Sequence, residues 1–282
     1  MYIFQHISKT GGTSFNLSYL PAAFGPKATF VLRGSDGPNL EDQQRAIAFS
    51  KEERARLKLI AGHNTDVLRP YYPDASYLSL VRDPVERSIS MYLHYKHHPD
   101  SWERTGKKIH ENNIGLGEFM DANWFHKAHN LQTRLLLGER FMTKEPREES
   151  AMLAAIRARF YLIGYTEAHE KFLFYLHLTC AFPLVLFNKR LVRRERTDFH
   201  PSQSDLEAVE RQNRLDRALY RCARQEFDRR TAEVWTPAVD DLYRRYMAAI
   251  DEYRRSTKEN PDATPLVWSP AETALVASPG RW

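Results

Sequence analysis

A short segment near the amino terminus has residue types that favour binding of an anion. It follows an apolar run over residues 2–7 and consists of Lys9, Thr10, Gly11, Gly12, Thr13 and Ser14. A strand that passes through glycines into a helix directs backbone N–H groups and a positive helix end at a ligand. In the usual nucleoside-triphosphate loop the lysine follows the glycines, whereas here Lys9 precedes them. Residues 9–14 therefore predict a phosphate cradle of a different kind.

Two further residues with useful chemistry, His63 and Arg82, each close a predicted strand. Because ligands of open α/β sheets bind at the carboxyl ends of strands, we expect Lys9, His63 and Arg82 to converge. Ser90 lies two turns into the helix after Arg82, and a guanidinium and a hydroxyl can share one phosphate. A lone Arg-Asp-Pro motif would favour a local ion pair for Arg82 and no special role for Ser90. Its occurrence together with the cradle favours a second anion site.

The elements that must position these residues alternate between strands and helices. Strands are predicted at 2–7, 57–61, 76–81, 161–164 and 183–187. Helices are predicted at 14–20, 40–49, 52–57, 84–95, 116–122, 130–137, 149–159, 167–180 and 236–253, and the segment 204–227 is compatible with one or two helices. Pro21 is expected to end the first helix. Ser50 and Glu53 have capping-box spacing, and Asp83 is expected to cap the helix from residue 84 with Glu86 as its capping-box partner. The alternation predicts an α/β fold, a three-layer sandwich with a central, mostly parallel sheet and a helical C-terminal part. One domain is expected over 1–255, followed by an irregular tail over 256–282.

Composition is that of a globular protein, with 42% hydrophobic and 27% charged residues in a chain of 282. A formal net charge of +5 permits an anionic ligand, although solubility explains it equally well. The two cysteines, Cys180 and Cys222, do not indicate a disulfide scaffold. No apolar run reaches the length of about 18 residues that a transmembrane helix needs, and the first strand leaves no room for a signal peptide. A cytoplasmic protein without a transmembrane segment is expected.

These motifs resemble the signatures of the sulfotransferases that use 3′-phosphoadenosine 5′-phosphosulfate (PAPS), in particular the carbohydrate-type branch that includes the heparan sulfate 2-O-sulfotransferases. The first family signature, His-Ile-Pro-Lys-Thr-Gly-Gly-Thr-Ser, matches residues 6–14 except that Ser8 replaces the proline. The second, Arg-Asp-Pro-x-x-Arg-x-x-Ser-x-Tyr, is complete between Arg82 and Tyr92. Weaker similarities follow in family order at 61–63, 130–136, 163–167 and 215–220.

The resemblance implies a P-loop-kinase-like layout and transfer of a sulfuryl group from PAPS to an acceptor hydroxyl, on a carbohydrate or a glycolipid. Lys9 would stabilise the leaving phosphate, while Thr10, Gly11, Gly12, Thr13 and Ser14 would hold the 5′ end of the nucleotide. Arg82 and Ser90 would hold the 3′-phosphate. This chemistry requires no Mg²⁺, so no metal site is expected, and no nucleic-acid partner is expected either.

The acceptor hydroxyl needs a general base, and His63 is the first candidate. An imidazole with an ordinary pKa of about 6.5 suits proton transfer near neutral pH. The resemblance also implies a base here, because a histidine in the comparable segment has that role in the 2-O-sulfotransferases. Asp66 is the alternative base, and a histidine that only forms hydrogen bonds is the alternative interpretation of His63. We expect His6, which precedes the cradle, to be structural.

Two other functions fit parts of the sequence. A nucleotide kinase or other phosphotransferase is disfavoured because no Gly-Lys-Ser/Thr closes the loop. A non-catalytic nucleotide-binding module is disfavoured by the presence of both Lys9 and His63. The basic run 189–196 fits either a contact with an anionic ligand or a solvated face. The histidines at 94–98 and 126–129 lack a cysteine or carboxylate at metal-ligand spacing, so we expect them at the surface.

Overall fold

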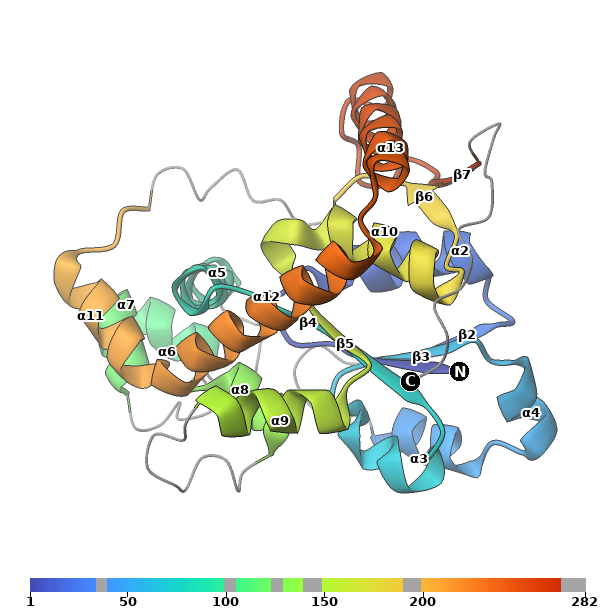
Figure 1. The fold of residues 1–282 in the computed structure, drawn as a ribbon. Coiled ribbons are helices and arrows are strands. Elements are labelled where there is room, and N and C mark those ends of the chain that lie inside the picture. Colours follow the sequence, from blue (N-terminus) through green and yellow to red (C-terminus); the bar gives the residue numbers. More distant parts are fainter. Residues whose placement is uncertain (34–39, 99–104, 123–128, 139–148, 190–198, 270–282) are drawn as a thin grey trace.

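A five-stranded, all-parallel sheet in the order β2-β3-β1-β4-β5 forms the centre of the molecule (Figure 1). The computed structural model describes residues 1–33, 40–98, 105–122, 129–138, 149–189 and 199–269. The strands of the sheet are β1 (Tyr2–Gln5), β2 (Thr29–Leu32), β3 (Leu59–Gly62), β4 (Ser76–Val81) and β5 (Leu162–Tyr165). The predicted α/β class with a central parallel sheet is confirmed.

Helices cover the sheet and extend beyond it. In the amino-terminal half they are α1 (Gly12–Ser14), η1 (Phe15–Tyr19), α2 (Leu20–Phe24), α3 (Leu40–Ala48), α4 (Lys51–Arg56), η2 (Thr65–Tyr71), α5 (Pro84–His97), α6 (Thr105–Glu111), α7 (Leu116–Asp121) and α8 (Leu131–Leu137). The later ones are α9 (Glu149–Arg159), η5 (Thr166–Ala168), α10 (His169–Cys180), α11 (Gln203–Gln212), α12 (Arg214–Val234) and α13 (Pro237–Ser256).

Alternate residues of each central strand enter two separate cores, and this makes the sheet the middle of three layers. In β1, Ile3 belongs to one core and Phe4 to the other; in β4, Tyr77 and Leu78 divide in the same way. The first core includes residues of α3, α8 and α9, and the second includes residues of α2 and α10, on the opposite side of the sheet (Figure 1). Because both faces are covered, β1, β3, β4 and β5 are buried on both sides, whereas most residues of the edge strand β2 are only partly buried.

The observed strands differ from the predicted set in two ways. The apolar run Phe30-Val31-Leu32 was not predicted as a strand, yet it forms the edge strand β2 and pairs with β3. The strand predicted over 183–187 does form, as β6 (Leu184–Leu186), but it pairs antiparallel with β7 (Leu266–Trp268) outside the central sheet. The tail over 256–282, which was expected to be irregular, therefore contributes the strand β7. In its pairing with β6, Val267 lies opposite Val185.

The helix after the cradle continues past Pro21, which was expected to end it. Residues Phe15–Tyr19 form a π-helical turn, and the Leu20 amide donates to the Phe15 carbonyl five residues back. Pro21 stands in the first turn of α2, directly after the π-helical turn, where the regular i→i−4 hydrogen-bond pattern is already interrupted. A continuous helical segment from Gly12 to Phe24 thus follows the cradle glycine at position 11.

Helix caps form largely as the sequence predicts. Ser50 and Glu53 make a reciprocal capping box at the start of α4. The Asp83 carboxylate accepts hydrogen bonds from the amides of Val85 and Glu86 at the start of α5. The side chain of Glu86, expected to complete a second capping box there, contacts Arg82 instead.

Candidate functional site

The three sequence-predicted strand ends lie side by side, because β1 is flanked by β3 and β4. Gln5 is paired with Gly62 of β3 and with Ser79 of β4. The segments that carry Lys9, His63 and Arg82 therefore leave the sheet at the same edge and from neighbouring strands. The predicted convergence of these three segments is confirmed.

The cradle backbone is held in an unusual conformation. Lys9 has φ 72° and Gly11 has φ 84°, both in the left-handed region that costs energy for any residue with a Cβ, such as Lys9. The Thr10 hydroxyl donates to the Ile7 carbonyl at 2.9 Å and closes the turn from inside. Thr10 is fully buried. Its hydroxyl therefore stabilises the loop from within, whereas the sequence analysis had expected Thr10 to help hold the 5′ end of a nucleotide.

A glycine is required at position 12 because the ring of His6 occupies the space of a side chain. A Cβ added to Gly12 would lie 2.0 Å from Cδ2 and 2.2 Å from Nε2 of His6. The His6 amide extends the β1 ladder by donating to the Gly62 carbonyl at 2.9 Å, which fixes the position of the ring below the cradle. The glycine of the motif thus serves close packing on His6.

His6 and His63 stack on each other, with ring centroids 4.2 Å apart and planes inclined by 27°. The stack follows from the register, because Gln5 pairs with Gly62 and the next residues are these two histidines. Burial lowers the pKa of His6 well below its ordinary value, and His63 and Lys9 lower it further. His6 is therefore a neutral ring, and it supports the candidate base from below.

Arg82 connects the second motif to the cradle. Its Nη1 donates to the Lys9 carbonyl at 3.2 Å, and its side chain is 17% exposed. The side-chain amide of Gln132 pairs with the Arg82 backbone. Its Oε1 accepts from the Arg82 N–H at 2.8 Å, and its Nε2 donates to the Arg82 carbonyl at 2.9 Å, as a neighbouring strand would. Burial lowers the pKa of Arg82, although Glu167 and Asp83 oppose the shift. The guanidinium is thus held in a partly dehydrated place beside the cradle.

Ser90 lies on the same face of α5 as Glu86, one helical turn further on. It is partly buried, and Glu86 contacts the Arg82 guanidinium. Arg82, Glu86 and Ser90 therefore form a row at intervals of four residues. The predicted pairing of Arg82 and Ser90 around one anion is compatible with this row, which also contains a carboxylate that the sequence analysis had assigned to helix capping.

Thr166 joins the cradle to the end of β4. Its hydroxyl lies 2.9 Å from the Thr10 carbonyl and 3.1 Å from the Val81 carbonyl. Thr166 was noticed in the sequence only as part of a weak family-like segment. Its position shows that this segment, directly after β5, stabilises the cradle.

A reciprocal pair of caps holds the helix that carries Gln132. The Asn130 side chain accepts hydrogen bonds from the amides of Leu215 and Asp216 at the start of α12. The fully buried Asp216 carboxylate accepts in turn from the amides of Gln132 and Thr133 at the start of α8. Two segments singled out in the sequence, 130–136 and 215–220, thus have one shared structural task, which is to place Gln132 against Arg82.

Asp66, the alternative base, is engaged by two arginines. Its Oδ1 accepts from Arg69 Nε at 2.5 Å and from Arg159 Nη2 at 2.7 Å. Arg159 also donates to the Leu136 carbonyl, so this ion-pair cluster fastens η2 to α8 and α9. These contacts give Asp66 a structural task.

Other residues considered in the sequence lie apart from the site or form structural contacts. Residues 190–196 of the basic run and His126 lie outside the described residues, and Lys189 pairs with Glu170 at 2.9 Å. Within the described ranges, no group of three or more His, Cys, Asp or Glu side chains has an arrangement suited to a metal ion. Cys180 and Cys222 are free thiols.

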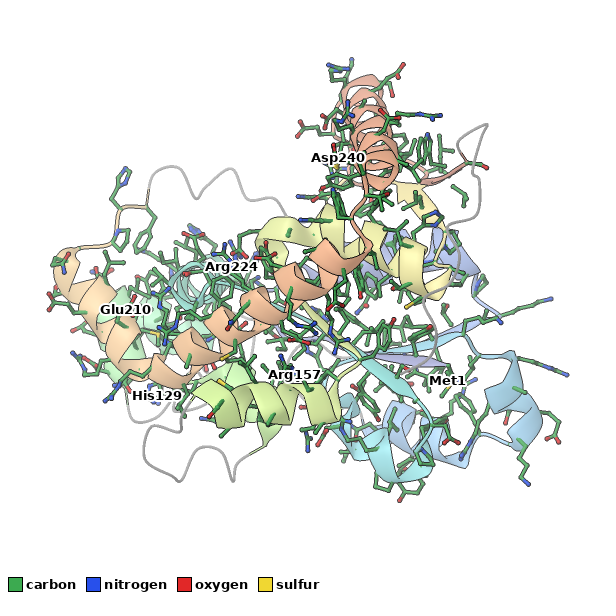
Figure 2. All side chains as sticks on the ribbon, in the orientation of Figure 1. Met1, His129, Arg157, Glu210, Arg224 and Asp240 are labelled. Carbon is green, nitrogen blue, oxygen red and sulfur yellow. The ribbon has the colours of Figure 1, made fainter. Side chains whose placement is uncertain are left out.

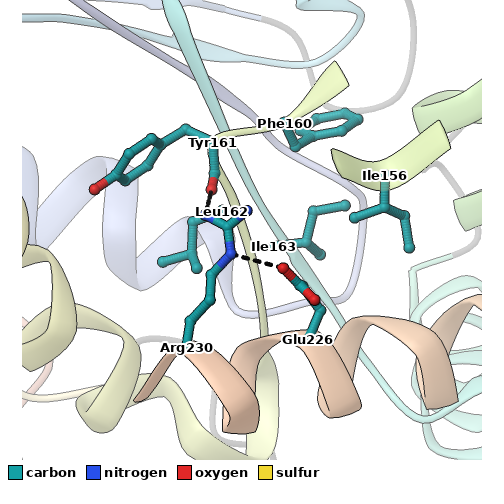
Figure 3. A pocket seen from close by; sticks show the side chains of 7 residues that line it. All are labelled: Ile156, Phe160, Tyr161, Leu162, Ile163, Glu226 and Arg230. Atoms are coloured by element: carbon teal, nitrogen blue, oxygen red, sulfur yellow. Dashed lines mark hydrogen bonds and ion pairs between the residues drawn. The ribbon is translucent and has the colours of Figure 1, made fainter. Parts of the chain in front are cut away.

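A small hollow lies at the other edge of the sheet, where β5 begins between α9 and α12 (Figure 3). Arg230 closes it by donating to the Tyr161 carbonyl and to Glu226. Glu226 also binds Arg157 of α9, whose position along the helix pair is labelled in Figure 2. The pKa of Glu226 is lowered by these arginines, although burial opposes the shift. This hollow is therefore the place of a structural ion-pair network that joins the two helices.

The arrangement at the carboxyl edge can bind anionic groups through backbone amides and a guanidinium, and it places an imidazole on the adjoining strand. A scan against protein-family models finds no match to this chain, and a search of curated proteins finds none either. Among the helices in the described part of the chain, none is both long enough and apolar enough to cross a membrane. The function is therefore argued from the site itself.

Proposed function

We propose that this protein is a sulfotransferase that transfers the sulfuryl group of PAPS to an acceptor hydroxyl. The observation that carries the proposal is the 3.2 Å contact between Arg82 and the Lys9 carbonyl, because it joins the two motifs that resemble the PAPS signatures. Two anion-binding elements at this spacing suit a nucleotide with phosphate groups at both its 5′ and 3′ positions. The proposed layout around them is P-loop-kinase-like.

The cradle binds the 5′-phosphosulfate in this proposal. The backbone amides in the first turn of the helical segment from Gly12 stand at its positive end, which suits phosphate oxygens. Lys9 supplies positive charge for the bridging oxygen on which charge develops as the 5′-phosphate leaves. Arg82 and Ser90 bind the 3′-phosphate, and Thr10 supports the loop from within.

His63 accepts the proton of the acceptor hydroxyl. The acceptor oxygen forms a bond to sulfur while the bond between sulfur and the bridging oxygen breaks. The products are a sulfate ester and 3′-phosphoadenosine 5′-phosphate (PAP), and the proton passes to the imidazole of His63. Stacking on the neutral His6 ring keeps the base on the strand beside the cradle, so base and leaving group are held by adjoining strands.

The acceptor in this proposal is a hydroxyl of a carbohydrate or glycolipid, as the resemblance implies. A nucleotide kinase is the rival function, and the position of Lys9 before the glycines disfavours it. Sulfated product should form when purified protein, PAPS and a panel of glycans, polysaccharides, glycolipids and phenols are combined. Lys9→Ala should lower turnover about a hundredfold or more, the cost of losing one stabilising donor at a developing charge. Phosphorylated product from ATP and no sulfated product would refute the proposal.

A further inference from the structure

The guanidinium of Arg82 has two contacts of opposite character. Nη1 donates to the Lys9 carbonyl at 3.2 Å, whereas Nη2 contacts the carboxylate of Glu86 at 3.4 Å. The Arg82 side chain is 17% exposed and the Glu86 side chain 43% exposed. One half of the guanidinium is thus fixed to the cradle, and the other half is occupied by a carboxylate that solvent can reach.

Three carboxylates flank Arg82, and two of them, Asp83 and Glu167, contact groups other than its guanidinium. Asp83 caps α5 and pairs with Arg217 Nη1 at 2.7 Å. Glu167 accepts from the Tyr220 hydroxyl at 3.1 Å and from the Asp83 amide at 3.3 Å. Among the described residues, Glu86 is the carboxylate that contacts the Arg82 guanidinium itself.

The position of Glu86 coincides with the place where a second anion would bind. Glu86 lies one turn before Ser90 on the same face of α5, and its carboxylate contacts the Arg82 guanidinium. A phosphate held by Arg82 and Ser90 together would compete with the Glu86 carboxylate for the N–H donors of the same guanidinium. Two anions cannot share these donors at low cost, because like charges at such a distance repel each other.

We propose that Glu86 is a built-in substitute anion, which holds Arg82 in the empty site and which the 3′-phosphate of the nucleotide displaces. The inference rests on the proposed function and adds to it a residue that sets how tightly 3′-phosphorylated nucleotides bind. Glu86 stands in the first turn of α5, where the positive helix end stabilises a carboxylate that has left Arg82. The competition weakens binding of the 3′-phosphate and speeds release of PAP, because PAP keeps that phosphate after transfer.

Titration calorimetry with PAP and with adenosine 5′-monophosphate, which lacks the 3′-phosphate, tests the inference without any turnover. Glu86→Gln and Glu86→Ala should each lower the Kd for PAP by up to about fivefold, the range set by an exposed ion pair, and slow its dissociation to match. The Kd for adenosine 5′-monophosphate should not change. Glu111→Gln is the matched control, since Glu111 also has an i,i+4 ion pair, with Lys107 at 3.6 Å on α6, and should leave both constants unchanged.

The outcomes separate this inference from the proposed function. If wild-type protein binds PAP and loses that binding in Arg82→Ala, but both Glu86 variants bind PAP no more tightly than wild type, the substitute-anion role is overturned. Weaker PAP binding in the Glu86 variants would make Glu86 a residue that orients Arg82, which also overturns it. If wild-type protein does not bind PAP at all, the proposed function fails first, and this inference fails with it.

Discussion

Arg82 Nη1 donates a hydrogen bond to the carbonyl oxygen of Lys9 across 3.2 Å, and this contact joins the ends of two neighbouring parallel strands. Both partners are fixed: Lys9 lies in the left-handed region, and the Arg82 backbone is paired with the Gln132 amide. A substitution in either motif should therefore alter the geometry of the other motif. The two motifs together form the proposed binding site for a nucleotide with two anionic ends.

Arg82→Ala should weaken PAP binding by about tenfold to a hundredfold, the cost of about 1.5–3 kcal/mol for a hydrogen bond to a charged group. Arg82→Lys should recover only part of this loss, because an ammonium cannot bind the Lys9 carbonyl and a phosphate in a fixed fork. Titration calorimetry measures both constants. Unchanged PAP affinity in Arg82→Ala would remove Arg82 from the site.

His63→Ala should lower the rate of sulfuryl transfer by about 10²–10⁴, the usual contribution of general-base catalysis, and leave PAP affinity nearly unchanged. Asp66→Asn is the comparison variant. It should keep most of the activity and lower the free energy of unfolding by about 1 kcal/mol or less, because it weakens the ion pairs with Arg69 and Arg159. Retained activity in His63→Ala together with lost activity in Asp66→Asn would make Asp66 the base.

Gly12→Ala should destabilise the protein by about 1–3 kcal/mol, because the new Cβ would overlap the ring of His6 at 2.0 Å. Adding His6→Ala should return part of this loss, and the double-mutant cycle should give a coupling energy of opposite sign to the single effects. Urea unfolding measures all three variants. Gly115→Ala is the control, since its Cβ would meet only Glu118 Oε2, at 3.6 Å. Equal losses at the two glycines would contradict the packing described.

Glu170 should make stability sensitive to acid. Burial alone would raise its pKa, but Lys189, His169 and Arg254 outweigh burial and lower the pKa to about 2. A lowered folded-state pKa adds stability above the unfolded value of about 4.3, on the order of 3 kcal/mol, and this is lost as pH falls toward 2. The stability difference between wild type and Glu170→Gln should therefore shrink between pH 5 and about pH 2. A constant difference would contradict the low pKa.

A neighbouring histidine acts at higher pH and must be separated from this effect. Burial lowers the pKa of His169 to about 4, so stability also falls between the ordinary histidine pKa of about 6.5 and pH 4. The loss in that upper window should persist in Glu170→Gln, because it belongs to His169. Chemical unfolding at closely spaced pH values distinguishes the two windows.

Much of the fold could be predicted because its signals are local. The strand Ser76–Val81 and the helix Glu149–Arg159 have the predicted bounds. The Asp-Pro pair at residues 83 and 84 predicts the cap that Asp83 forms at the start of α5. The edge strand β2 is only four residues long, and no alternation marks it. The continuation of the helix past Pro21 depends on a π-helical turn, which residue propensities do not indicate.

The candidate site could be predicted only as far as parallel strands bring their ends together. Because the carboxyl ends of parallel strands meet at one edge of the sheet, the convergence of the segments that carry Lys9, His63 and Arg82 could be predicted. The stack of His6 on His63 depends on strand register, and the inward hydroxyl of Thr10 depends on the turn of the cradle. These are contacts between distant residues or within an irregular loop, where sequence periodicity carries no information.

The central claim is that one metal-independent site binds a nucleotide by its 3′ and 5′ phosphates. The most direct test is the change in melting temperature of the purified protein on adding PAP or ATP, each with and without Mg²⁺. The account predicts that PAP without Mg²⁺ raises the melting temperature clearly, that Mg²⁺ adds nothing, and that ATP does much less. Stronger stabilisation by ATP with Mg²⁺ than by PAP would contradict it.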